Sequence, residues 1–432
     1  MPGRLNIFQR TMVQWNELHP YNAVHALRIP SPLAGVRLQN AINLTLERRG
    51  LSALELDRKR GTFCYFGGPA KCEFTLVAPG ENPRAALVAE VERHINTPFA
   101  SHERFCPFRF FAVPEADGFT FGLVYFHAAA DAEAVATLLR EILETFSSPR
   151  PPAARGEIEL YPSPRAGLLR HHPRVWLRKL CKLPAQSRSL RRSCRALYCD
   201  PQDTGNGFTL FTLAPEVLRA VVNASKSWEV TLNDLFLAAL IKHLAPLAAG
   251  RVGTTGRGQI SVGCIVNLRR DLGVEGDRTF GLFLGSFVVA HAIAAAAELK
   301  AIAQAVRRQT AAIKRHRLYL ATPLDLALAN IFQNFSSLER QRKFYQRNHP
   351  LWGGVTNMNL NAIWKGSATV RPLDYFRAVS TGPVTPLVLS VTTAGDAAQI
   401  GLSWRTTVFS AEQIGRLKKD FPGTFAGLEP TA

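Results

Sequence analysis

The sequence predicts a mixed α/β (α+β) protein built of two lobes. Runs of β-branched and aromatic residues are repeatedly followed by segments with apolar residues at helical spacing, which is typical of strands alternating with helices. The 432 residues exceed the roughly 250 to 300 at which a single hydrophobic core stops growing. A stretch rich in Pro, Ser and Arg separates two such series. We therefore expect an N-terminal lobe over 1–160, a basic linker or crossover over 161–206 and a C-terminal lobe over 207–432.

The composition is that of an ordinary soluble protein. Hydrophobic residues make up 47% and charged residues 20%, which excludes disordered, collagen-like and coiled-coil chains. The seven cysteines are scattered and form no CxxC pair, so they predict neither a disulfide framework nor a zinc ribbon and favour a reducing, cytoplasmic compartment. The first residues contain no apolar core of a signal peptide, so secretion is not expected.

Two strand–helix units are predicted in the first third of the chain. A strand over Ala23–Ile29 precedes an amphipathic helix that ends before Gly50 and whose apolar positions are Leu38, Ile42, Leu44 and Leu46. An aromatic and β-branched strand over Phe119–Phe126 precedes a helix whose apolar residues share one face, namely Val135, Leu138, Leu139, Ile142, Leu143 and Phe146. In this arrangement His127 ends the strand and Asp131 opens the helix.

Further strands and helices follow the basic stretch. FTLFTL and PEVLRAVVNAS indicate a strand and then a helix. Thr231 and Asp234 have the spacing of a capping box at the start of the next helix. A half-buried strand is then indicated by the alternation of Ile260, Val262, Cys264 and Val266.

The last part of the chain begins with an uncharged run over Phe280–Ala297. We expect a buried strand as far as Val289 and then the start of an Ala-rich helix, which we favour over a membrane span. LVLSVTTAGDAAQIGLSW indicates two strands joined at Gly395–Asp396. Ser410 with Gln413 predicts the cap of a final helix.

The formal net charge is +19, and most of the excess lies in two segments. Residues 150–195 hold twelve Arg and Lys against two Glu, and residues 307–347 hold nine against two acidic residues. Such segments attract acidic proteins, anionic lipids, nucleotide phosphates or nucleic acid. No nucleic-acid-binding module is recognisable, so nucleic acid is not an expected partner. Pro173 and Pro184 should divide the first segment, which favours a solvated crossover over one interfacial helix.

Several catalytic layouts are absent from the sequence. It contains no GxSxG, GxxxxGK or HExxH motif, and the glycines of GTTGRG at 253–258 indicate a surface loop. His171, His172 and Cys181 lie among arginines that would repel a cation, so no metal site is predicted. What remains is His127 and Asp131, spaced as HxxxD where the strand meets the helix. A His and an Asp at this spacing often occur together by chance. The interpretation therefore depends on the position of the two residues at the strand–helix junction.

With this motif, the chain resembles the condensation-domain-like, or chloramphenicol-acetyltransferase-like, acyltransferase superfamily, as a stand-alone condensation-type or wax-ester-synthase-like member. The resemblance covers nearly the whole chain and includes NIFQRTMVQWNELHPYNAVHALRIP, FHAAAD, TLNDLFLAAL, VNLRRDLG, TFGLFLGSF, VTNMNLN and IGLSWRTTVFSAEQIGRL. It implies two acyltransferase lobes in a V with a central tunnel. It also implies His127 as general base, with Asp131 as structural support paired to Arg269.

The resemblance further implies the substrates and partners. The donor would be an acyl-CoA or acyl-carrier-protein thioester, used as co-substrate without a bound cofactor or metal, and the acceptor a small-molecule or lipid alcohol or amine. Basic residues at the tunnel mouth would receive coenzyme A phosphates or an acidic carrier protein, and the 150–195 segment could rest on an anionic membrane. The chain would then act in the cytoplasm or peripherally at the inner membrane face.

Departures from the family pattern define an alternative. Many relatives have HHxxxDG, whereas Phe126 precedes His127 here and Ala132 follows Asp131, and Leu282 replaces the asparagine of a second family element. The alternative is a catalytically silent module that binds an acyl carrier or an anionic membrane. The enzymatic interpretation requires the His127 ring to be exposed in an open passage between the lobes.

Overall fold

The structure is a computed structural model that describes residues 1–70, 72–148, 159–160, 172–252, 256–274, 276, 278–294, 297–333, 337–364, 372–426 and 428. Its first half contains β1 (Pro2–Arg4), α1 (Ile7–Leu18), β2 (Asn22–Ile29), α2 (Gly35–Arg49), β3 (Ala53–Asp57), β4 (Thr62–Phe66), β5 (Glu73–Leu76), α3 (Pro83–Asn96), β6 (Phe108–Glu115), β7 (Gly118–Phe126), α4 (Ala132–Ser147), β8 (Glu159–Leu160), α6 (Pro173–Arg192) and β9 (Asn206–Leu213).

The second half contains α7 (Pro215–Ser227), α8 (Leu232–Ala249), β10 (Gln259–Asn267), α10 (Arg269–Leu272), β11 (Thr279–Phe280), β12 (Leu284–Ala292), α11 (Leu299–Arg315), the 3₁₀ helix η1 (Leu318–Ala321), α12 (Thr322–Gln333), α13 (Leu338–Asn348), β13 (Leu351–Asn359), α14 (Leu360–Ile363), β14 (Tyr375–Val379), β15 (Leu387–Ala394), β16 (Ala397–Arg405) and α15 (Ala411–Ala426). The mixed α/β class predicted from the sequence is confirmed.

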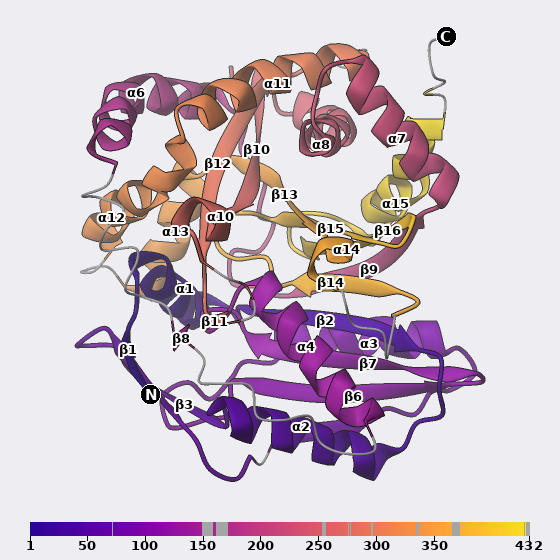
Figure 1. The fold of residues 1–432 in the computed structure, drawn as a ribbon. Helices are drawn as coiled ribbons and strands as arrows, with labels where there is room; N and C mark the ends of the chain where they lie inside the picture. The colour runs from indigo at the N-terminus through magenta and orange to yellow at the C-terminus, as the bar shows by residue number, and fades with distance from the viewer. Residues whose placement is uncertain are drawn as a thin grey trace.

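A five-stranded sheet organises the N-terminal part, in the order β14-β2-β7-β6-β5. Its centre is β7, which is buried at every position. Helices α2 and α4 lie side by side against this part of the molecule (Figure 1). The edge strand β14 comes from the C-terminal part of the chain and pairs antiparallel with β2, with Arg377 opposite His25. The chain thus returns to complete its first sheet, and the boundaries at 160 and 206 stay a prediction.

A six-stranded sheet organises the C-terminal part, in the order β12-β10-β13-β15-β16-β9. Helices α7, α8, α11 and α15 gather on its far side from the first sheet (Figure 1). The predicted hairpin is present as β15 and β16, joined at Gly395–Asp396. Helix α8 begins with the predicted capping box of Thr231 and Asp234. Its length and apolarity would suit a membrane span, but 61% of this window is buried, as in the core helix of a soluble protein.

The linker region differs from the prediction. Pro173–Arg192 form one helix of 20 residues, α6, so the expectation that Pro173 and Pro184 divide this segment is wrong. Pro173 occupies the first turn, where its missing N–H has no acceptor within the helix. Pro184 removes one backbone hydrogen bond inside the helix. Tertiary contacts offset this loss. Val175 and Lys179 are buried and fix one face of α6, and just beyond the end of the helix the N–H of Cys194 donates to the carbonyl oxygen of Gln259 at 2.7 Å.

A second difference concerns the predicted Ala-rich helix. Strand β12 continues to Ala292, and α11 begins at Leu299 after its N-cap Glu298. Ala290–Ala292 pair with Gln259–Ser261 of β10, so strand pairing overrides the helix propensity of alanine. In the GTTGRG segment, 253–255 lie outside the described residues, and Gly256 has a φ of +62° that suits a turn.

Candidate active site at the junction of the two sheets

His127 follows the last residue of β7 at the junction of the two sheets. Its backbone N–H donates to the carbonyl of Tyr21 at 3.3 Å. Its ring packs against Tyr21 and Tyr125, with ring centroids 5.2 and 5.7 Å away. The side chain is 8% exposed. The ring is therefore far more enclosed than the open passage that the enzymatic interpretation requires.

Burial sets the protonation state of this imidazole. It lowers the pKa of His127 to about 4, against the opposing effects of the backbone oxygens of Ala130 and His127 and of the Asp131 carboxylate. The positive charge of Arg377 adds to the lowering. The ring is thus neutral at pH 7, as a general base must be, but a pKa of about 4 makes it a weaker base than an exposed imidazole with a pKa of about 6.5. Its Nδ1 atom is buried, and no atom of the described residues lies in good hydrogen-bonding geometry to it, so the backbone oxygens of Ala130 and His127 act on it only through looser contacts.

Asp131 holds the loop that follows His127. It caps α4 by accepting from Ala134 N at 2.9 Å, and its other oxygen accepts from Phe283 N at 3.0 Å. The predicted contact with Arg269 is present, with Nη2 to Oδ1 at 3.0 Å and both side chains buried. Arg269 also donates to Thr279 O at 3.1 Å. The carboxylate therefore ties the HxxxD loop to a segment that follows β10.

The three alanines between His127 and Asp131 are buried, and the first is held from α1. Gln9 Nε2 donates to the carbonyl of Ala128 at 3.1 Å. Beside this loop lies a small pocket with room for about one water molecule. Most of the residues that line it are apolar, and Gln9 and Tyr65 add polar atoms; the lining consists of Leu5, Gln9, Leu54, Leu56, Phe63, Tyr65, Phe126, Ala128, Ala129, Leu160, Phe280 and Gly281. His127 is not among these lining residues, so the predicted central tunnel stays a prediction.

Sequence reasoning missed a group of buried polar side chains near His127, in which His25 packs against the same ring, Tyr125, that His127 contacts. His25 Nδ1 lies 2.6 Å from the Tyr375 hydroxyl. Arg377 is 2% exposed and bonds to oxygens of the second sheet, with Nε to Thr392 Oγ1 at 2.9 Å and Nη2 to Val391 O at 2.7 Å. Burial, then Arg377 and His127, keep the pKa of His25 well below its usual value. The sequence offered a signal for both residues, because His25 in VHAL and Arg377 in YFRAV are ionisable residues inside apolar strands.

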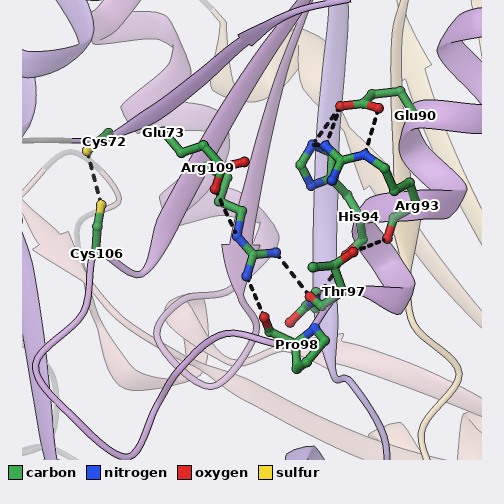
Figure 2. A network of polar contacts seen from close by, with 10 residues as sticks. Cys72, Glu73, Glu90, Arg93, His94, Thr97, Pro98, Cys106 and Arg109 are labelled. Atoms are coloured by element: carbon green, nitrogen blue, oxygen red, sulfur yellow. Dashed lines mark hydrogen bonds and ion pairs between the residues drawn. The ribbon is translucent and has the colours of Figure 1, made fainter.

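A second polar network lies near α3 and β6 (Figure 2). His94 is fully buried, and its Nε2 lies 3.1 Å from Glu90 Oε1. Arg109 donates to the carbonyls of Thr97 at 3.0 Å and Pro98 at 2.5 Å, so it fastens β6 to the end of α3. These side chains serve the packing of the first sheet, and we assign them no catalytic role.

The remaining candidates from the sequence do not form a metal site among the described residues. No group of three or more His, Cys, Asp or Glu is arranged to hold a metal ion in that part of the chain. Cys181 is exposed on α6 and His172 precedes the helix, while His171 lies outside the described residues.

Neither protein-family models nor curated proteins match this sequence. Solved structures do match over nearly the whole chain. The first condensation domain of the calcium-dependent antibiotic synthetase aligns with a TM-score of 0.70 at 16% identity, covering 100% of this chain and 98% of that one. The cyclization-docking bidomain from Sorangium cellulosum gives 0.71 at 12%, covering 99% and 84%. The epimerization domain from the third module of tyrocidine synthetase B gives 0.64 at 12%, covering 99% and 97%.

Proposed function

Because the chain has the fold of the condensation domains, within the chloramphenicol-acetyltransferase-like acyltransferase superfamily, we propose that it is a stand-alone acyltransferase. It would move an acyl group from an acyl-CoA or acyl-carrier-protein thioester to an alcohol or amine. The observation that carries this proposal is the position of His127 directly after β7, where the loop that follows it is fixed by Asp131 and Arg269. The fold alone does not choose the reaction, since condensation, cyclization and epimerization domains share it.

The proposed reaction needs one proton acceptor. His127 takes the proton of the acceptor hydroxyl or amine as its oxygen or nitrogen attacks the thioester carbonyl. The new C–O or C–N bond forms, the C–S bond breaks, and the proton passes from the imidazole to the leaving thiolate. Base catalysis of this kind contributes roughly 10² to 10⁴-fold, and positioning the two substrates supplies much of the rest.

The lining of the small pocket beside the HxxxD loop suits the apolar chain of an acyl substrate in character, though not in size. Its walls are mostly apolar, and Ala128 and Ala129 belong both to the loop and to the pocket. It has room for about one water molecule, so an acyl chain would enter beside the residues that follow the base only after these side chains move apart. The thioester carbonyl would then approach His127 from the loop side. In this structure Tyr21 and Tyr125 enclose the ring, so the proposed turnover requires a more open conformation in which one of these side chains has moved away from it.

Acceptor-dependent thiol release tests the proposal. The protein is incubated with acyl-CoA and acyl-carrier thioesters together with alcohols and amines, and free thiol is measured over time. We expect turnover that His127→Ala lowers by about 10² to 10⁴-fold. His243→Ala is the matched control, because His243 is half-buried and its ring bonds to Thr424 in the C-terminal part at 2.8 Å, away from the HxxxD loop. Unchanged release from His127→Ala, or none across the panel, would overturn the proposal.

The enclosure of His127 favours a second candidate function. A ring that is 8% exposed suits a protein that keeps the fold without turnover and binds an acyl carrier or an anionic surface. Carrier capture by both the wild type and His127→Ala, with no thiol release from either, would establish this function in place of the first.

A further inference from the structure

Helix α6 presents a charged face to solvent along its whole length. Only Val175 and Lys179 are buried, and Lys179 Nζ pairs with Asp325 at 2.7 Å. The sequence of α6 contains no acidic residue. Its exposed basic residues are Arg174, Arg178, Lys182, Arg188, Arg191 and Arg192. In Figure 1 the helix lies at the edge of the molecule, beyond α12 and away from α7 and α15.

Long apolar side chains stand among these basic residues. Leu177 is 64% exposed and Leu180 is 49% exposed. With the exposed Pro184, they recur at spacings of three and four residues, so they share one stripe of the helix. The two exposed leucines and the neighbouring arginines make the outer surface of α6 amphipathic.

The positive surface continues onto the end of α11. His316 is the residue that follows α11, and its Nδ1 lies 3.4 Å from Nη1 of Arg178 on α6. Lys314 and Arg315 are exposed there. Slight burial and then the charges of Lys182, Arg178 and Arg315 lower the pKa of His316, which shows how closely the basic groups gather.

We propose that α6 and the end of α11 form a docking surface for an anionic membrane. Basic side chains would meet the lipid headgroups while Leu177 and Leu180 enter the boundary of the acyl chains. Charge complementarity alone would also fit an acidic protein. The lipid interface is favoured because it takes up both features of α6, the arginines and the exposed leucines between them.

Vesicle flotation with the full chain tests this surface. One set of vesicles is pure phosphatidylcholine, and the other contains about one third phosphatidylglycerol. We expect binding to the anionic vesicles only, weakening as salt screens the charges. Reversal of Arg174, Arg178 and Arg188 to Glu should lower partitioning at least about a hundredfold, since each basic side chain contributes about fivefold. Leu177→Ser with Leu180→Ser should lower it by about tenfold.

The matched control carries the same change of charge on the other side of the molecule. Arg219, Lys226 and Lys419 are exposed on α7 and α15, and their reversal to Glu should leave vesicle binding nearly unchanged. The proposal is overturned if the wild type does not bind anionic vesicles at low salt, or if the control weakens binding as much. It is also overturned if the two serine changes have no effect, because vesicle binding would then depend on charge alone and would not favour a lipid surface over an acidic protein. Thiol release is measured in the same variants without vesicles and should not change.

Discussion

At His127, burial rather than a charged partner determines the protonation state. The lowered pKa of about 4 means that protonation begins only well below neutrality. A nuclear magnetic resonance titration of the ring protons, assigned with His127→Ala, should therefore show this pKa. Tyr21→Ala should shift it toward 6.5, because removing the neighbouring ring lets water reach the imidazole. An unperturbed value in the wild type would contradict the enclosed geometry.

Asp131 combines a helix cap with a buried ion pair. Asp131→Ala leaves the guanidinium of Arg269, 3% exposed, without its carboxylate. We expect the free energy of unfolding to fall by about 3 to 5 kcal/mol, measured by urea denaturation. The control is Asp117→Ala, which removes an ion pair of Arg28 from a carboxylate that is 78% exposed and should change stability little. Equal effects of the two substitutions would argue against a buried, supporting role for Asp131.

The thiols of Cys72 and Cys106 lie 3.0 Å apart (Figure 2). A disulfide requires about 2.05 Å between the sulfurs, so a small movement would join them. Oxidised glutathione, which takes up the two electrons and two protons, should convert this pair first among the seven cysteines. Alkylation followed by mass spectrometry should show two fewer free thiols, and Cys106→Ser should abolish the change. Preferential modification of the exposed Cys181 and Cys199 would contradict this expectation.

At the scale of the elements, α6 shows a helix that tertiary contacts maintain against its own sequence. Pro184 lacks the N–H that would bond within the helix, so Pro184→Ala should stabilise the protein by about 1 to 3 kcal/mol. Thermal and urea denaturation measure this gain. Pro215→Ala is the control, since Pro215 lies in the first turn of α7, where proline fits and no gain is expected. A destabilising Pro184→Ala would mean that the ring itself packs usefully.

For the whole molecule, two neutral histidines, the buried His127 and the half-buried His349, predict acid lability. Burial lowers the pKa values of His127 and His349 to about 4, below the 6.5 of an unfolded chain. Between these pKa values the unfolded state binds more protons than the folded state. The contribution of the two histidines to the free energy of unfolding is therefore fully present above about pH 6.5 and is lost as the pH falls toward 4. Each of the two contributes on the order of 3 kcal/mol. Urea denaturation from pH 7.5 to 4.5 should show this decline, with a shallower slope for His349→Gln. A flat profile would contradict it.

Local pattern was sufficient for most of the elements. The apolar face of α4 and the capping pair of α8 depend on residues within a few positions of each other, so spacing alone predicted both. The predicted strand-to-helix junction is also present, with His127 directly after β7 and Asp131 as the N-cap of α4. Where distant partners decided the outcome, the prediction failed: β12 runs on to Ala292 because β10 pairs with it, and α6 spans Pro184 because neighbouring elements support it.

The sequence by itself predicted the mixed α/β class and the HxxxD junction. Through the resemblance to the acyltransferase superfamily it also predicted the pairing of Asp131 with Arg269. Only the tertiary structure placed Arg377 and His25 side by side, since β14 and β2 are more than 300 residues apart in the chain and meet by strand pairing. Only it enclosed the His127 ring between Tyr21 and Tyr125. Burial and electrostatic environment are sums over all neighbours in space, so a motif can name a candidate base but cannot set its pKa or its accessibility.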